Sequence, residues 1–334
     1  MTSGQRRLSA AATAAIVVAL SAACGGTNTT PPAGDGTASA AATQGAGTEL
    51  AGQVKADGSS TVAPLTSAAA EFFAEEQPKI NVTVGTSGTG GGFEKFCNGE
   101  TDISNASRPI KDEEKAACET KGVKFTELTV ATDALTVVVN KENTWATCLT
   151  TAQLKKMWEP AAEGKITTWK QVDPKFPDEP LKLFGAGTDS GTFDYFTDEI
   201  NGEEGASRKD YSPSEDDNVT VQGVTGSKGG LGYFGFTYFE ENADKLKAVE
   251  IDSGEGCVAP SVEAAQNGKY TPLARPLFVY PSAAAAKRPE VVAFLDFYIN
   301  NISKITTDAK YIPLNSEQEA KLKTDLATLK TQAG

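Results

Sequence analysis

Residues 79–96 read KINVTVGTSGTGGGFEKF, and this stretch decides the fold. The β-branched run from Ile80 to Val84 is typical of a strand, and an apolar pattern with helical spacing begins at Phe93. Between them, residues 85–92 hold five glycines and three hydroxyl side chains. The pattern predicts a strand that leads through a glycine-rich loop into a helix, and such a loop can hold a ligand at the helix start.

The same alternation of strand and helix patterns continues along the chain from Val54 onward. It predicts an α/β fold with a largely parallel sheet, in which ligands bind at the carboxyl ends of the strands. Residues 123–142 are one long β-rich stretch, which we expect to carry the chain from one lobe into another. Further helices are expected at 150–158, from Phe193, at 289–301 and at 316–330, and a strand at 275–281.

The bulk composition excludes several classes of function. The chain has 334 residues, a net charge of -13 and an isoelectric point near 4.7, which argues against nucleic-acid binding. It contains no histidine, which removes the commonest general base, the Ser-His-Asp and Cys-His systems and most zinc sites. We therefore expect no metal and no cofactor.

The first residues have the layout of an export signal. Arg6 and Arg7 precede an uncharged apolar run that ends at Cys24 in the sequence LSAAC, which resembles the lipobox of bacterial lipoproteins. We expect residues 1–24 to be a signal peptide and the protein to be anchored to the outer face of the cell membrane by lipidated Cys24. A plain secretory peptide is the alternative. Residues 25–48 are rich in Gly, Ala, Thr and Pro and are expected to form a flexible tether.

Four cysteines remain in the body, and an even count in an exported chain favours disulfides. Three pairings are possible. We prefer Cys97 with Cys118 and Cys148 with Cys257, because one short helix and turn separate the first pair. A metal site is the weaker alternative, since no two of these cysteines are two to four residues apart.

Three loops share one design: residues 57–64 (DGSSTVAP), 86–92 (TSGTGGG) and 187–192 (GTDSGT). Each follows a β-rich run and leads into a helix, at Pro64 or Leu65, at Phe93 and at Phe193. The unpaired N–H groups of a helix start attract anions, and glycine lets the backbone approach closely. The alternative is that each loop only caps its own helix. The P-loop and dinucleotide motifs fail, because both need a different residue at Phe93.

Arg108 belongs to a fourth segment, residues 101–110 (TDISNASRPI), where it follows a short β-rich run. Its guanidinium is a planar fork that fits two oxygens of a tetrahedral oxyanion. A solvated arginine is the alternative.

With these segments together, the sequence resembles the substrate-binding lipoproteins of phosphate-specific ABC transporters over roughly residues 50 to 315. DGSSTVAPL, GTSGTGGGFEKFCNGETDISNASRPI, GTDSGTFDYF and GGLGYFGFTYF follow the order and spacing of that family. The resemblance implies a two-lobed periplasmic-binding-protein fold of type II with two crossover strands. Residues 49–132 and 271–334 would form one lobe and 133–270 the other. It implies a monomer that delivers inorganic phosphate to ABC permease subunits and is not an enzyme.

The phosphate ligands implied by the resemblance come from all four segments: Ser60, Thr61, Thr89, Gly90, Ser107, Arg108, Ser190, Gly191 and Thr192.

Two departures from the family bear on the ion. Well-known members have an aspartate at the position of Ser107 and an arginine at the position of Ala186. That aspartate accepts the proton of phosphate and so rejects sulfate. We expect Arg108 to supply the missing guanidinium, and Asp133 to supply the missing acceptor or to orient Arg108; Asp189 competes for the acceptor role. Asp133 could instead be a strand-end acid bonded to backbone.

Other functions stay open at this point. Sulfate, arsenate or an organic phosphate could replace phosphate as the ion. A secreted phosphate-ester hydrolase with Ser190 or Ser60 as nucleophile is an alternative of another class, although no histidine is present to activate a serine.

Overall fold

The computed structural model describes residues 50–333. The predicted signal peptide (1–24), the lipidation at Cys24 and the predicted tether (25–48) lie outside these residues. None of the helices in the described part is long and apolar enough to cross a membrane.

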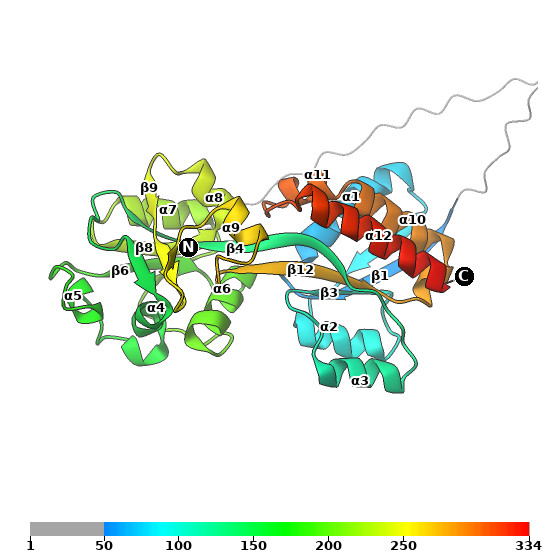
Figure 1. The fold of residues 1–334 in the computed structure, drawn as a ribbon, viewed down its shortest axis with the longest axis horizontal. Helices are drawn as coiled ribbons and strands as arrows, with labels where there is room; N and C mark the ends of the chain where they lie inside the picture. Colours follow the sequence, from blue (N-terminus) through cyan, green and yellow to red (C-terminus); the bar gives the residue numbers. More distant parts are fainter. Residues whose placement is uncertain (1–49, 334) are drawn as a thin grey trace, which may run out of the picture. The chain divides into compact units, whose positions relative to one another are not determined.

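A nine-stranded sheet runs through the whole described chain (Figure 1). Its order is β2-β1-β3-β12-β4-β8-β6-β7, and β9 also pairs with β4. Three strands at each end are parallel to one another, whereas β4 and β12 are antiparallel to their neighbours. The strands are β1 (Gly52–Gly58), β2 (Ile80–Val84), β3 (Ile103–Ala106), β4 (Leu128–Asn140), β6 (Lys182–Ala186), β7 (Ser212–Ser214), β8 (Gly230–Gly235), β9 (Leu246–Ala248) and β12 (Ala274–Pro281).

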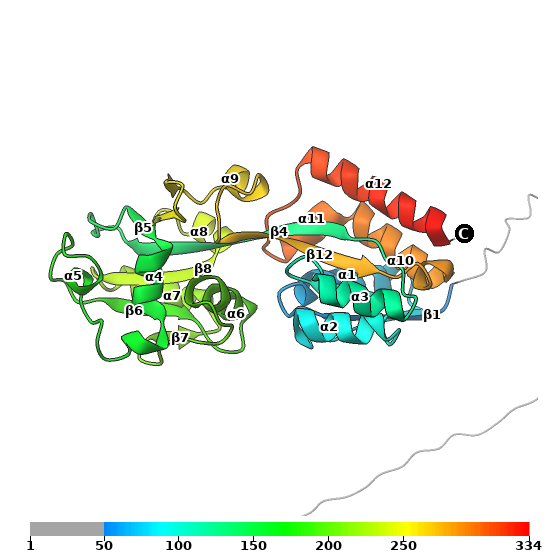
Figure 2. The same cartoon turned by 60° about the horizontal axis from the view of Figure 1, so that its bottom comes forward.

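The two central strands connect the halves of this sheet, as Figures 1 and 2 show. The first part of β4 pairs with β12, and its second part, from Leu135 to Val139, pairs with β8. β4 is buried along nearly its whole length. A strand buried on both faces reads as a continuous apolar run, which explains the long β-rich stretch in the sequence.

Helices cover both faces of the sheet, and the hydrophobic core between helices and sheet consists of separate clusters. The largest cluster joins α1, α10, α11 and α12 to the first half, and the next joins α4, α5 and α6 to the second. The longer helices are α1 (Ala63–Glu76), α2 (Gly88–Cys97), α3 (Asp112–Thr120), α4 (Thr151–Trp158), α7 (Asp217–Thr225), α10 (Pro289–Asn300), α11 (Ile302–Asp308) and α12 (Ser316–Ala333); the shorter ones are α5 (Trp169–Val172), α6 (Gly191–Phe196), α8 (Phe236–Glu241) and α9 (Val262–Gln266).

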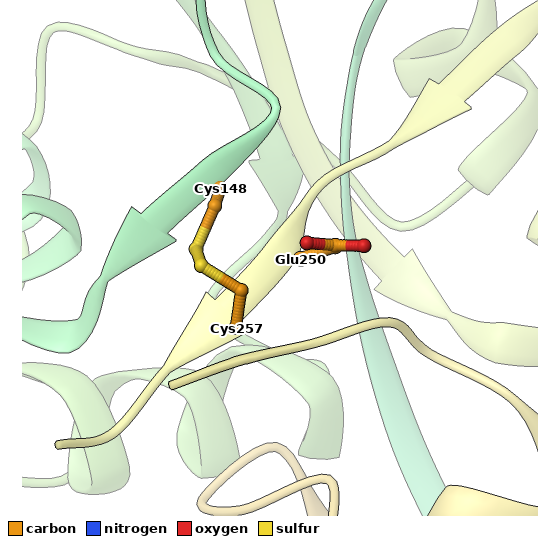
Figure 3. Close-up of side chains that lie close together, drawn as sticks. All are labelled: Cys148, Glu250 and Cys257. Carbon is orange, nitrogen blue, oxygen red and sulfur yellow. A yellow bond between two sulfur atoms is a disulfide. The ribbon is translucent and has the colours of Figure 1, made fainter. Parts of the chain in front are cut away.

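A small second sheet is formed by β5 (Cys148–Thr150), β10 (Glu250–Asp252) and β11 (Cys257–Val258). Both disulfides preferred from the sequence are present, Cys97–Cys118 and Cys148–Cys257. Glu250 lies beside the second one (Figure 3), which makes a group of three potential metal ligands. Because the two sulfurs are bonded to each other, no thiolate is available for a metal.

The predicted elements are mostly found where the sequence places them. The strand Ile80–Val84 is confirmed, and Thr150 caps α4 by accepting a hydrogen bond from Gln153 N. Two predicted helix starts are wrong: α2 begins at Gly88 rather than Phe93, and α6 at Gly191 rather than Phe193. The apolar pattern marks only the part of each helix that faces the core, whereas their glycine-rich first turns carry few apolar side chains.

Candidate functional site

A cavity of about 470 Å³ lies where the ends of β1, β2 and β3 meet α6 and β12. It is lined mainly by polar side chains and glycines from segments far apart in the sequence. Seven of the ten predicted ligand residues line it: Ser60, Thr61, Thr89, Gly90, Ser107, Arg108 and Gly191. Asp133, Ser190 and Thr192 do not. The other lining residues are Ser59, Ser87, Gly88, Lys111, Asp194, Tyr195, Asp198, Glu199, Glu204 and Arg275.

The first loop, Ser59–Thr61, is fixed by its neighbours. Ser59 N donates to the carbonyl of Asn105, and Tyr311 Oη donates to the carbonyl of Thr61 over 2.7 Å. Gly58 has a φ of +139° and lies so close to Asn105 that a side chain would clash. Ser60 Oγ is exposed and makes no hydrogen bond to the described residues, so it is free to bind a ligand.

The start of α2 is held against β1 by Asp57. The Asp57 carboxylate accepts hydrogen bonds from Ser87 N (3.0 Å), Ser87 Oγ (2.7 Å) and Lys95 Nζ (2.6 Å). Burial raises the pKa of Asp57, but these bonds outweigh it and leave the pKa below its ordinary value. No side chain caps α2, so the first-turn N–H groups at Gly88 and Gly90 remain available at the cavity.

Thr89 joins the second loop to the segment of residues 101–110. Its Oγ1 accepts a hydrogen bond from Ser107 N (3.2 Å) and lies 3.1 Å from Ser107 Oγ. The Arg108 guanidinium lies at the same wall, but it makes two hydrogen bonds to the Glu114 carboxylate, of 2.8 and 2.9 Å. Glu114 also accepts Lys111 N at the start of α3. Arg108 is therefore paired, and Asp133 does not orient it.

The third loop, residues 187–192, brings α6 against the first loop. Ser190 Oγ accepts a hydrogen bond from Thr192 N, so Ser190 caps α6, and neither residue reaches the cavity. Gly191 does reach it. A Cβ at position 191 would lie 2.7 Å from Thr61 Oγ1 and 3.4 Å from Ser60 Oγ, so only glycine fits between the two loops.

Arg275, at the start of β12, is a basic residue of the cavity that the sequence reasoning missed. It lies opposite Asp133 in the β4–β12 ladder, and its Nε and Nη2 both lie 3.4 Å from Asp133 Oδ2. Nη2 also donates to Thr61 Oγ1 over 3.1 Å, and the guanidinium carbon lies 3.5 Å from the ring centre of Tyr195. Burial raises the pKa of Asp133 despite the nearby positive charge of Arg275.

Four carboxylates from α6, from the π-helical turn Thr197–Asn201 and from the loop after it also line the cavity, and the sequence reasoning missed them: Asp194, Asp198, Glu199 and Glu204. Burial raises the pKa of Asp194 and of Glu199, and a neighbouring acid adds to each shift: Glu204 for Asp194 and Asp198 for Glu199. Carboxylates that line the cavity can accept a hydrogen bond from a ligand that carries a proton. Asp189 is exposed and does not line the cavity.

Signals for the missed residues are present in the sequence. Asp194 belongs to GTFDYF, the helical pattern already recognised. Arg275 precedes a proline, as Arg108 does, and it begins the second strand that joins the halves. What the sequence could not give is the pairing of residues 133 and 275, which lie far apart along the chain.

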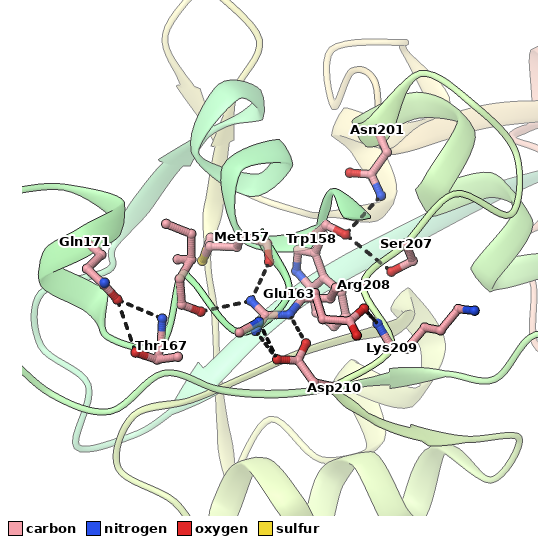
Figure 4. Close-up of polar contacts among 12 residues, drawn as sticks. Met157, Trp158, Glu163, Thr167, Gln171, Asn201, Ser207, Arg208, Lys209 and Asp210 are labelled. Carbon is pink, nitrogen blue, oxygen red and sulfur yellow. Dashed lines mark hydrogen bonds and ion pairs between the residues drawn. The ribbon is translucent and has the colours of Figure 1, made fainter. Parts of the chain in front are cut away.

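A second cavity, of about 550 Å³, is bordered by Arg208, but that guanidinium is fully engaged (Figure 4). Arg208 is 4% exposed and donates to Asp210 and to the carbonyls of Met157 and Ile166. These bonds tie α4 to the segment after α6, which indicates a structural role.

Comparison with known proteins gives consistent matches. The family described as "PBP superfamily domain" matches residues 33–301. The protein SphX of Synechococcus elongatus is 53% identical over 262 residues, which cover 78% of this chain and 77% of SphX. The phosphate-binding protein PstS of Staphylococcus saprophyticus is 41% identical over 278 residues, which cover 81% of this chain and 84% of PstS.

A crystal structure has the same fold. It is described as a possible phosphate binding protein from Planctomyces limnophilus and aligns with a TM-score of 0.80 and 46% identity, covering 84% of this chain and 99% of that one. Together the matches confirm the predicted α/β, two-lobed periplasmic-binding-protein fold.

Proposed function

The chain belongs to the PBP superfamily and to the family of the phosphate-binding protein PstS, and we propose that it binds inorganic phosphate and delivers it to an ABC importer. One observation carries this proposal: hydroxyl and backbone donors from four separate loops line one cavity together with basic side chains. Such a set of fixed donors can replace the hydration shell of a small oxyanion. The proposed donors include Ser60, Thr89, Gly90, Ser107 and Gly191.

The acids of the cavity favour phosphate over sulfate. Phosphate carries a proton at neutral pH, whereas sulfate carries none and can only accept hydrogen bonds. A carboxylate in contact with the ion therefore attracts the P–OH group and repels sulfate. Asp194 and Glu199 take this role in the proposal, in place of Asp189, which is exposed away from the cavity.

Calorimetric titration of the ligand-stripped protein tests the ion. We expect phosphate to bind and sulfate to bind at least about a hundredfold more weakly, since a carboxylate that faces sulfate repels it and gains no hydrogen bond from it. Arsenate, which also carries a proton, should bind like phosphate, and an organic phosphate ester more weakly. Equal binding of sulfate would contradict the role of the acids.

A hydrolase is the other class considered, and the geometry gives it little support. Ser190 Oγ accepts the Thr192 N–H, which favours a cap over a nucleophile. Within residues 50–333, no side chain that could act as a base hydrogen-bonds to Ser60 Oγ. We propose a receptor that performs no chemistry. Turnover of a phosphate ester that is abolished by Ser190→Ala would contradict this.

The lobe limits predicted from the sequence belong to the proposal as well: 49–132 with 271–334, and 133–270. The two largest hydrophobic clusters support them, because one draws on Val54 to Ala131 and Leu277 to Ala333 and the other on Leu135 to Leu273. Closure of the lobes around phosphate would present the bound form to permease subunits. Anchoring through Cys24 and a monomeric state complete the proposal.

A further inference from the structure

We propose that Arg275, and not Arg108, is the guanidinium that binds the anion, and that Asp133 and Tyr195 position it. This inference rests on the proposed function. It replaces the expectation, drawn from the sequence, that Arg108 supplies the guanidinium missing at Ala186.

The charge of Arg108 is already compensated by Glu114. Its two terminal nitrogens both donate to Glu114, and Nη1 also donates to the carbonyl of Pro109. The bidentate pair is neutral as a whole, and breaking it would leave the partly buried Glu114 carboxylate without its cation. Glu114 in turn fixes the start of α3 through Lys111 N, so the Arg108 pair orders the wall of the cavity.

Arg275 has donors to spare. Its contacts with Asp133 are 3.4 Å long and reach only one carboxylate oxygen, whereas a tight charge-assisted hydrogen bond is about 2.7 to 2.9 Å. Nη1 makes no hydrogen bond to any residue of the described chain, although its side chain is only 17% exposed. A mostly buried guanidinium with an unused nitrogen at a polar cavity is suited to receive an oxyanion.

The surroundings of Arg275 fix its orientation without saturating it. Asp133 is 6% exposed and lies across the ladder, behind the cavity. Tyr195 covers the guanidinium face and is itself held by a 2.6 Å hydrogen bond from its Oη to the carbonyl of Pro272. A planar cation stacked on an aromatic ring keeps its edge nitrogens free for hydrogen bonds in its own plane.

Arg275 also contacts both sides of the cavity. Thr61 belongs to the loop after β1, whereas Tyr195 belongs to α6, and Arg275 touches both from β12. An anion bound to Arg275 would therefore meet donors from the first loop and from α6 together. Arg275 would therefore link anion binding to the approach of two walls of the cavity, the first loop with Thr61 and α6 with Tyr195.

Titration of matched variants with inorganic phosphate tests the inference. We expect Arg275→Gln to weaken binding at least about thirtyfold and Arg275→Lys to weaken it less, because lysine keeps the charge but not the fork. Arg108→Gln should weaken binding less than Arg275→Gln does, because it disturbs only the order of the cavity wall. The opposite ranking of Arg275→Gln and Arg108→Gln would overturn the inference.

Two further measurements separate binding from folding. Arg275→Gln could destabilise the fold by leaving Asp133 without its partner, so the double variant Asp133→Asn/Arg275→Gln removes both charges, and thermal unfolding confirms that it is folded. We expect this folded double variant to bind as weakly as Arg275→Gln; wild-type affinity in it would overturn the inference. Wild-type protein that binds no phosphate would instead overturn the proposed function itself.

The positioning role of Asp133 has its own readout. Asp133→Asn keeps the shape but removes the charge next to Arg275, so we expect phosphate affinity to fall and the shape of its pH dependence to change. If Asp133 had only a structural role, Asp133→Asn would lower the melting temperature and leave the shape of the affinity–pH profile unchanged. That result would overturn the positioning role of Asp133.

Discussion

Gly191 lies so close to Thr61 that a methyl group on it would be 2.7 Å from Thr61 Oγ1 and 3.3 Å from Thr61 N. Residues from the start of α6 and from the loop after β1 thus meet with no side chain between them. Every other residue type would push these two walls of the cavity apart, because the nearest neighbours include backbone.

Gly191→Ala should therefore weaken phosphate binding, by about tenfold or more, and leave the melting temperature close to that of the wild type. Alanine is a better helix former than glycine, which compensates part of the steric cost in α6. Calorimetry and thermal unfolding of the same samples measure both quantities. Gly235→Ala is the matched control, since no atom lies within 4 Å of the Cβ added there; equal affinity of Gly191→Ala and this control would contradict the prediction.

Asp57→Ala should lower both stability and affinity. The substitution removes the acceptor of two Ser87 hydrogen bonds and the partner of Lys95, so the start of α2 loses its attachment to β1. We expect the free energy of unfolding to fall by about 1 to 3 kcal/mol. Lys95→Met leaves the Ser87 hydrogen bonds in place. It should lower the free energy of unfolding less than Asp57→Ala does, because the Lys95 side chain is 41% exposed.

The pH dependence of this effect has a definite sign. The pKa of Asp57 is lower in the folded state, so its contribution is present above its ordinary pKa of 3.8 and is lost as the pH falls through the lowered value. Urea titrations at pH 7 and pH 3 measure this effect. The difference in the free energy of unfolding between Asp57→Ala and the wild type should be smaller at pH 3 than at pH 7.

Asp210→Asn should destabilise the second half of the sheet through Arg208. Hydrogen bonds from Arg208 lower the pKa of Asp210 to about 2, so its contribution is complete above pH 3.8 and disappears as the pH falls through about 2. We expect the free energy of unfolding to fall by about 1 to 2 kcal/mol at pH 7. This is less than for a fully buried ion pair, because the Asp210 side chain is 38% exposed. The control is Asp178→Asn, which changes an acid at an exposed position. If this control lowered the free energy of unfolding as much as Asp210→Asn does, the role of the Arg208 pair would be contradicted.

Removal of the Cys148–Cys257 disulfide should lower the free energy of unfolding by about 2 to 5 kcal/mol, because the bond closes a loop with a sequence separation of 109. Denaturant unfolding of Cys148→Ala/Cys257→Ala measures this loss. The bond ties β5 to β11, and neither cysteine lines the candidate cavity, so we expect the affinity for phosphate to stay unchanged. A double variant as stable as the wild type would show that the small sheet holds together without the bond.

The sequence predicts the local elements well, because each carries its own pattern. Ile80–Val84 and the capped helix from Thr151 are examples in which alternation and a capping residue decide the structure. The first turns of α2 and α6 were missed because glycines carry no apolar signal, although the same glycines allow the close contacts of these turns.

The candidate site could be predicted where its residues lie in helix-start loops. Five of the seven predicted residues that line the cavity lie in such loops: Ser60, Thr61, Thr89, Gly90 and Gly191. Arg275 and the partnership of Arg108 with Glu114 depend on which side chains the folded chain brings together, and local patterns do not encode that information. Arg108 was assigned from its chemistry alone, and its chemistry is satisfied by a neighbour six residues away.

The burial of β4 has a consequence for local unfolding. Its residues from Val130 to Asn140 are buried, and it pairs with β12 along its first part and with β8 and β9 along its second. We therefore expect its amide hydrogens to exchange with solvent only when the whole described body unfolds. The amides of β4 would then report a single unfolding free energy for residues on both sides of the crossover. If the lobes move while these slow amides stay protected, β4 must bend without opening its hydrogen bonds. The β4–β12 ladder is already irregular at one place, the register shift in β12 between Leu277 and Phe278.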